Sequence, residues 1–231
     1  MESTLFLAVT GPEMEIFHPQ KLAYMACHFS PYHPGLSNLP ASLPPGSILL
    51  VDDSMSIEGH DPQAVTQQLE DIVRCFSPYA ILLDFQNPPT TAGIEMANTI
   101  LHSISCLVAV TKPYAASLNC PVFLAPPPVN MPLGKYLEPW KTREIFLEVT
   151  SDCLQFTITA EGCKVISFPT DTTPNTSQQD LRLHCHYHVD VFPDRAVFTL
   201  RRTREDLLDM AQEALELGVL GTIGFYRELN T

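Results

Sequence analysis

Short runs of hydrophobic residues without a polar interruption divide the first half of the chain. The runs cover residues 5–9, 47–51, 80–83, 106–110 and 121–125. Such runs are typical of strands that are buried on both faces, as in parallel sheets. Between them, hydrophobic residues recur at helical spacing over 62–76 and 94–104, which predicts two amphipathic helices. The alternation of strand and helix predicts a parallel sheet with right-handed crossovers.

Local signals refine this pattern. Asp61 precedes Pro62, so its carboxylate can cap the free N–H groups at the start of the helix. Leu22, Met25 and Phe29 share one helical face, which favours another helix over residues 19–29. Residues 30–46 hold five prolines and two glycines, which favours a long loop that either forms part of a binding site or covers the surface.

The period of the pattern changes after Trp140. Hydrophobic and polar residues alternate over 145–149, 154–158 and 165–168, and a hairpin over 183–200 turns at Pro193-Asp194. We therefore predict an antiparallel β insertion over residues 144–201. A capping-box pattern at Thr203 then predicts a helix that stops at Gly218, and residues 219–225 predict a final strand. The chain is predicted to form one α/β domain.

Composition narrows the classes of function. The chain has 231 residues, of which 45% are hydrophobic, enough to bury one sizeable core. Its formal net charge of -13 disfavours binding to nucleic acid or to an anionic membrane. Seven cysteines without a C-x-x-C pair, and an N-terminus that begins with an acidic residue, favour a cytoplasmic protein. The sequence lacks a glycine-rich phosphate-binding loop, so we expect no cofactor.

Polar residues follow two of the predicted strands. Asp84, Gln86 and Asn87 follow the run 80–83, and Asp52 and Asp53 follow the run 47–51. The carboxyl ends of parallel strands are where α/β proteins place functional side chains, so Asp84 and Asp53 are candidate catalytic carboxylates and the other three are candidate ligand-binding residues. Two carboxylates separated by a water would suit an inverting hydrolase. Ordinary turns at strand ends would also explain these residues.

The segment from Tyr79 to Gln86 resembles the hallmark of glycoside hydrolase family 18, the chitinase-like barrels, in which a strand ends D-x-x-D-x-D-x-E. Asp84 falls on the last aspartate and Gln86 on the glutamate that serves as general acid. Tyr79 and Leu82 take the places of the two earlier aspartates. The antiparallel insertion before the last helix and strand, and the closing segment 218–229, are similar to those of the same barrels.

The resemblance implies a (β/α)8-type TIM barrel with trimmed helices and a cleft for an oligosaccharide or another small molecule at the carboxyl ends of its strands. Because an amide has no proton to transfer at neutral pH, it also implies that family 18 chemistry is absent or very slow. Asp84 and Gln86 would then bind a sugar, on which Trp140 could also stack. Whether the chain is an enzyme stays open: it binds without cleaving, or it uses other acids.

His184, His186 and His188 form a second group of candidates. They alternate along one predicted strand, so we expect their side chains on one face. Two of them with Asp190 or Glu148 could bind a metal ion and make the chain a metal-dependent hydrolase. Alternatively, they are polar residues on a solvated face and bind no metal. A third alternative is a non-catalytic interaction module whose antiparallel sheet pairs with a partner chain.

Overall fold

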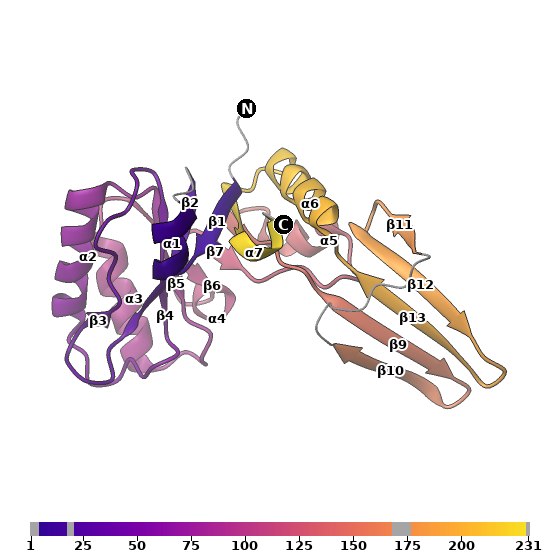
Figure 1. The fold of residues 1–231 in the computed structure, drawn as a ribbon. Coiled ribbons are helices and arrows are strands. Elements are labelled where there is room, and N and C mark those ends of the chain that lie inside the picture. Colours follow the sequence, from indigo (N-terminus) through magenta and orange to yellow (C-terminus); the bar gives the residue numbers. More distant parts are fainter. Residues whose placement is uncertain (1–4, 18–20, 168–176, 230–231) are drawn as a thin grey trace.

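Eight parallel strands form a closed barrel in the computed structural model, which describes residues 5–17, 21–167 and 177–229 (Figure 1). The strands follow one another around the barrel in sequence order, and β1 pairs with both β2 and β14 to close it. They are β1 (Leu5–Val9), β2 (Leu22–Phe29), β4 (Ile48–Asp52), β5 (Ala80–Asp84), β6 (Leu107–Thr111), β7 (Val122–Leu124), β8 (Ile145–Glu148) and β14 (Gly221–Phe225). The predicted TIM barrel is confirmed.

Strand β2 lies where the spacing of Leu22, Met25 and Phe29 favours a helix, so that prediction is wrong. The segment is apolar almost throughout, and an apolar run matches the helical and the strand period equally well. Its side chains are used on both sides of the sheet: Ala23 lies in the cluster inside the barrel, whereas Tyr24 lies in the cluster outside it. The long loop that follows contains a two-residue strand, β3 (Leu36–Ser37), antiparallel to β2.

Helices cover the barrel unevenly. The helices are α1 (Gly11–Phe17), α2 (Pro62–Phe76), α3 (Thr91–Ser103), α4 (Lys112–Ala115), α5 (Leu133–Leu137), a 3-10 turn η1 (Glu138–Trp140), α6 (Arg204–Glu216) and α7 (Tyr226–Leu229). Helix α2 begins as predicted, because the Asp61 side chain accepts a hydrogen bond from the backbone N–H of Gln63 at 3.1 Å. Between β6 and β8 the helices are only four and five residues long, which agrees with trimmed helices. No helix in the described ranges combines the length and the hydrophobicity needed to cross a membrane.

The core has two parts, which alternate along each strand. Side chains such as Phe6, Leu82 and Phe146 fill the inside of the barrel. Their neighbours, such as Ile81 and Leu83, point outward and pack beneath the helices. Because every barrel strand is covered on both sides, its residues are apolar in succession, which is the pattern that the sequence shows.

A second, antiparallel sheet projects from one side of the barrel (Figure 1). Its strands are β9 (Cys153–Thr159), β10 (Gly162–Ser167), β11 (Gln178–Asp180), β12 (Cys185–Val191) and β13 (Arg195–Arg201), in the order β10-β9-β13-β12-β11. The predicted insertion is present but begins later than residue 144. Ile145–Glu148 is barrel strand β8, which pairs in parallel with β7 and β14. Buried Arg202 joins the end of β13 to the barrel by donating a hydrogen bond to the carbonyl of Pro127 at 2.7 Å.

Candidate functional site

Three barrel strands end in an acidic residue that faces the barrel interior. Asp52 ends β4, Asp84 ends β5 and Glu148 ends β8. Each continues the row of side chains that fills the barrel, since residues two positions earlier, such as Leu50 and Leu82, belong to the interior cluster. Asp52 and Asp84 are also direct partners in the parallel pairing of β4 with β5. The carboxyl ends of the barrel strands, here called the mouth, therefore gather three carboxylates.

The carboxylate of Asp84 is hydrogen-bonded to Gln86, two positions after it. The side-chain amide of Gln86 donates a hydrogen bond to Oδ1 of Asp84. Burial raises the pKa of Asp84, the bond from Gln86 opposes that rise, and the charges of Asp52 and Asp53 add to it. The predicted pair of Asp84 and Gln86 is thus brought together at the mouth, with Gln86 exposed to solvent.

Glu148 also lies at the mouth. From the sequence, it is considered only as a possible metal ligand and is not grouped with Asp52 and Asp84. Burial raises the pKa of its carboxyl to about 7, and the negative charges of Asp84 and Glu228 contribute to the rise. Asp84 and Glu148 line the same cavity, which has a volume of about 50 Å³ and otherwise mostly apolar walls, including Met25 and Phe225. One sequence pattern could have placed Glu148 at the mouth. An apolar run, Ile145-Phe-Leu, leads directly into Glu148, just as apolar runs lead into Asp52 and Asp84.

A larger cavity adjoins the first and shares Ala8, Met25 and Phe225 with it. Its volume is about 320 Å³, and it extends to side chains of α1 and α7. Glu228 at its edge accepts hydrogen bonds from the backbone N–H and the hydroxyl of Ser151, at 2.8 and 2.6 Å. The mouth is therefore hollowed from the Asp84 carboxylate out to the C-terminal helix.

Asp53, the second candidate catalytic carboxylate, holds the loop that follows β5. Its two carboxylate oxygens accept the backbone N–H groups of Gln86 at 2.8 Å and of Asn87 at 3.1 Å. The side-chain amide of Asn87 donates in return to the backbone carbonyl of Asp53 at 2.7 Å. Asp53 is only 3% exposed and does not line the cavity of Asp84 and Glu148. Asp53 and Asn87 thus fix the loop after β5, which orients Gln86.

The two remaining ligand-binding candidates lie in different places. Asp52 is at the mouth, where its carboxylate also accepts the backbone N–H of Ser54 at 2.9 Å. Trp140 lies in η1, five residues before β8 begins, which places it toward the amino end of that strand. Its side chain packs against the outer core cluster and is not among the residues that line the Asp84 cavity. The structure therefore does not bring Trp140 to the mouth.

The three histidines do not form a common site. His186 and His188 lie on β12, but His184 precedes the strand with a left-handed backbone (φ 45°), so the expected row of three is wrong. Each imidazole contacts a different carboxylate. The partners of His184, His186 and His188 are Glu213, Asp206 and Asp190, at 2.5, 2.8 and 3.0 Å. Within the described residues, no three His, Cys, Asp or Glu side chains are grouped as metal ligands would be.

No protein-family model and no curated protein matches the sequence. Solved structures do. An N-acetylglucosaminidase of glycoside hydrolase family 18 from Paenibacillus barengoltzii has a TM-score of 0.62 at 8% identity, over 99% of this chain and 98% of that one. The chain shares the TIM-barrel fold of this enzyme. The spore cortex-lytic enzyme SleL of Bacillus cereus gives 0.58 at 10% identity, over 96% and 70% of the two chains. A mutant family 18 chitinase from Cycas revoluta, in complex with (GlcNAc)4, gives 0.58 at 11% identity, over 96% and 94%. At these identities the likeness establishes the fold.

Proposed function

We propose that the mouth of the barrel binds an oligosaccharide. The observation that carries this proposal is that Asp84, held by Gln86, shares a cavity with Glu148 at the carboxyl end of the barrel. The adjoining cavity of about 320 Å³ falls in the range of small-molecule sites, roughly 300–1,000 Å³. The (GlcNAc)4 complex of the Cycas revoluta chitinase, which has the same fold, supports an oligosaccharide as the ligand class.

The chemistry of the walls suits a sugar. Asp84 and Glu148 offer carboxyl oxygens and Gln86 offers an amide, so the mouth can accept hydrogen bonds from hydroxyl groups and donate one to a carbonyl. Phe225 and Met25 supply apolar surface between these groups. A few polar groups set in a largely apolar wall are what a concave ligand site needs, because the apolar wall adds affinity and the polar groups fix the orientation.

We further propose that binding occurs without the family 18 reaction. The resemblance to the family motif puts Gln86 where a general acid would protonate the leaving oxygen, and an amide has no proton to give at neutral pH. Tyr79 and Leu82 stand at the two earlier acidic positions, and Leu82 is completely buried inside the barrel. With three of the four motif acids replaced, Asp84 remains to position a sugar.

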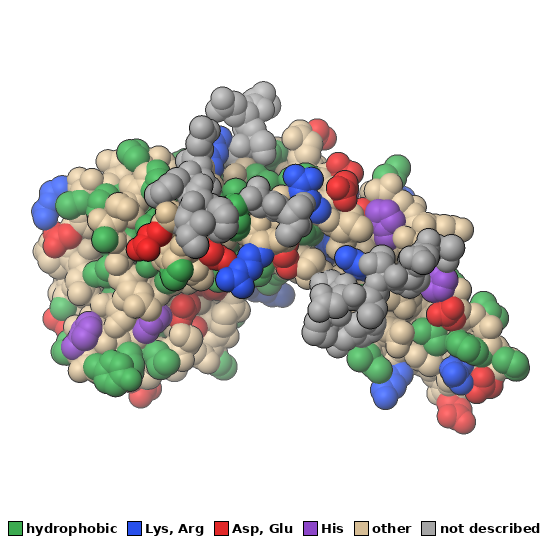
Figure 2. Space-filling model, viewed as in Figure 1, with side chains coloured by type: hydrophobic (Ala, Val, Ile, Leu, Met, Phe, Trp, Pro, Cys, Tyr) green, Lys and Arg blue, Asp and Glu red, His purple; other side chains and the backbone are tan. Residues whose placement is uncertain are grey.

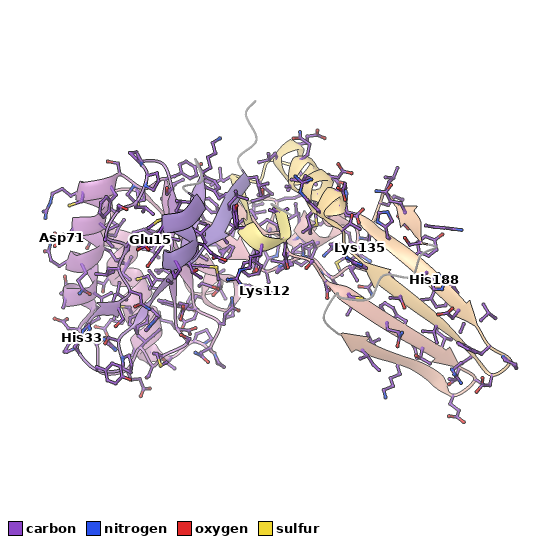
Figure 3. The ribbon with its side chains drawn as sticks, in the orientation of Figure 1. Glu15, His33, Asp71, Lys112, Lys135 and His188 are labelled. Atoms are coloured by element: carbon purple, nitrogen blue, oxygen red, sulfur yellow. The ribbon has the colours of Figure 1, made fainter. Side chains whose placement is uncertain are left out.

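Calorimetric titration with (GlcNAc)4 tests the proposal. The double variant Asp84→Ala/Gln86→Ala should weaken binding at least about tenfold, because both polar partners in the mouth are lost. The matched control is Gln67→Ala/Asp71→Ala, which removes a carboxylate–amide pair on the exposed face of α2, where Figure 3 labels Asp71. If the double variant binds (GlcNAc)4 as tightly as the wild type does, the ligand does not bind at Asp84 and Gln86. If the wild type itself does not bind (GlcNAc)4, the proposed function is wrong.

A second candidate function is hydrolysis that uses Glu148 as the proton donor. The specific observation that favours it is the raised pKa of Glu148, about 7, because such a carboxyl is partly protonated at neutral pH. If the wild type cleaves (GlcNAc)4, Glu148→Gln should lower the rate by about 100-fold or more, since a positioned general acid contributes 10²–10⁴. Glu144→Gln, an exposed acid just before β8, is the control. Binding without cleavage by the wild type would exclude this candidate.

A further inference from the structure

Two cavities lie among the loops that follow β2, β4 and β5, on one side of the mouth. The larger has a volume of about 580 Å³ and lies between residues 30–34, after β2, and residues 55–60, after β4. The smaller, of about 320 Å³, shares Met55 and Glu58 with the larger and continues to Asn87, after β5. Both volumes fall in the range of small-molecule sites. The two cavities form one continuous depression, here called the rim groove.

The rim groove meets the mouth beside Gln86. Asn87, which lines the groove, is the next residue after Gln86, whose side chain is hydrogen-bonded to Asp84. Asp53 fixes these two neighbours by accepting both of their backbone N–H groups, at 2.8 and 3.1 Å. A chain-like ligand that leaves the mouth past Gln86 therefore enters the rim groove.

Hydrogen bonds hold the two walls of the larger cavity together. The hydroxyl of Ser30 accepts the backbone N–H groups of Tyr32 at 3.2 Å and of His33 at 3.3 Å, which shapes the loop after β2. His60, on the loop after β4, accepts the backbone N–H of Gly35 through Nδ1 at 2.9 Å. The groove is thus formed before a ligand arrives, which lowers the entropy that binding costs.

Two large hydrophobic side chains are exposed inside this groove. Tyr32 is 93% exposed and Met55 is 42% exposed, and both line the larger cavity from different loops. Figure 2 shows hydrophobic and histidine side chains together at the surface in the region where Figure 3 labels His33, the neighbour of Tyr32. Exposed hydrophobic surface that is held in a concave site is expected where a ligand binds. The other large hydrophobic side chains that are exposed among the described residues lie in or beside the antiparallel sheet or at the end of α6: Ile158, Val165, Ile166, Leu181, Val191, Phe192 and Leu217.

We propose that the rim groove binds the sugar rings of an oligosaccharide that extend beyond the mouth, with one ring stacked on Tyr32. A sugar ring has an apolar face of C–H groups and an edge of hydroxyl groups. The aromatic ring of Tyr32 fits the apolar face, and Ser56, Glu58 and His60 supply polar atoms for the hydroxyl groups. This subsite rests on the proposed function, because the same ligand occupies the mouth and the groove. A nucleobase also stacks on aromatic rings, but the net charge of -13 disfavours a polyanion.

The length of the oligosaccharide separates the groove from the mouth. In calorimetric titrations, the wild type should bind (GlcNAc)6 at least about tenfold more tightly than (GlcNAc)2, because only the longer ligand fills both sites. Tyr32→Ala should remove most of this gain and leave the affinity for (GlcNAc)2 unchanged. Tyr32→Phe keeps the aromatic ring and should keep the gain. The control Leu217→Ala truncates another exposed hydrophobic side chain, at the end of α6, and should match the wild type.

Two methionines report by NMR which site is occupied. Met25 lines the cavity of Asp84 and Glu148, whereas Met55 lines the rim groove. The protein is labelled at its methionine methyl groups, and the two signals are assigned with Met25→Leu and Met55→Leu. Titration with (GlcNAc)2 should shift the Met25 signal alone, and titration with (GlcNAc)6 should shift both signals.

The possible outcomes distinguish the groove from the proposed function. If (GlcNAc)6 shifts the Met25 signal but not the Met55 signal, or binds Tyr32→Ala as tightly as it binds the wild type, the groove is overturned and oligosaccharide binding at the mouth stands. A loss of affinity that Leu217→Ala reproduces also overturns the groove. If the wild type binds neither oligosaccharide, both proposals are wrong.

Discussion

Glu148 should make the stability of this protein fall as the pH rises through the neutral range. Its pKa is raised from an ordinary value of 4.5 to about 7 by burial and by the charges of Asp84 and Glu228. At 1.36 kcal/mol per unit, a difference of about 2.5 units corresponds to roughly 3 kcal/mol. Because the folded pKa lies above the unfolded one, the native state holds the proton more tightly. The loss of folding stability caused by ionised Glu148 is therefore absent below pH 4.5, grows between pH 4.5 and 7, and is complete above pH 7.

Glu148→Gln removes this cost, because glutamine is neutral at every pH and has nearly the same shape. Urea unfolding between pH 4.5 and pH 8.5 should show equal stability of variant and wild type at the acidic end, and a variant up to about 3 kcal/mol more stable at the alkaline end. Glu144→Gln, which alters an exposed acid beside the same strand, should follow the wild-type curve. Parallel curves for Glu148→Gln and wild type across the whole range would refute the reasoning.

Three further changes test the local geometry by urea unfolding. Asp53→Asn should destabilise the protein by about 2–4 kcal/mol, because two backbone N–H groups lose a charged acceptor. Asp52→Asn should destabilise it by less than about 1 kcal/mol, because only the backbone N–H of Ser54 is affected. Equal effects of the two variants would contradict the conclusion that Asp53 holds the loop after β5. Thr203→Ala removes the observed capping box of α6 and should cost about 1 kcal/mol, so an unchanged midpoint would argue against that cap. Gly93→Ala should destabilise despite the better helix propensity of alanine, because the added Cβ would lie 2.5 Å from Oη of Tyr114; a stabilised variant would show that this side chain moves freely.

The sequence predicts the barrel well wherever local chemistry and burial agree. Strand β5 is an uninterrupted apolar run because both of its faces are covered, and α2 has its own cap at Asp61. Prediction fails where a run is apolar but has no clear period. Residues 22–29 match a helix as well as a strand, and Ile145–Glu148 matches either a barrel strand or the first strand of the insertion. Only the neighbours that each segment pairs with decide between these structures.

The same limit applies to the candidate site. Asp52 and Asp53 are adjacent in the sequence, and which of them faces the mouth depends on the phase of β4, which Ile48 and Leu50 set by filling the barrel interior. That phase cannot be read from a run that is apolar on both faces. Trp140 is excluded from the mouth by its place near the amino end of β8, a fact about the folded barrel that its aromatic character does not reveal.

The buried acids of the chain separate into two kinds, and the difference indicates where function lies. Asp53 and Asp206 are buried with hydrogen-bond donors on their carboxylates, so their burial stabilises the fold around them. Among the described residues, Glu148 has no hydrogen-bond donor and instead lies near the charge of Asp84. A carboxyl whose pKa is raised by burial and by neighbouring negative charges is expected where a ligand or a reaction uses it, because groups with perturbed pKa values concentrate at functional sites. This loss of stability therefore falls at the mouth, which also holds the proposed ligand site of Asp84 and Gln86.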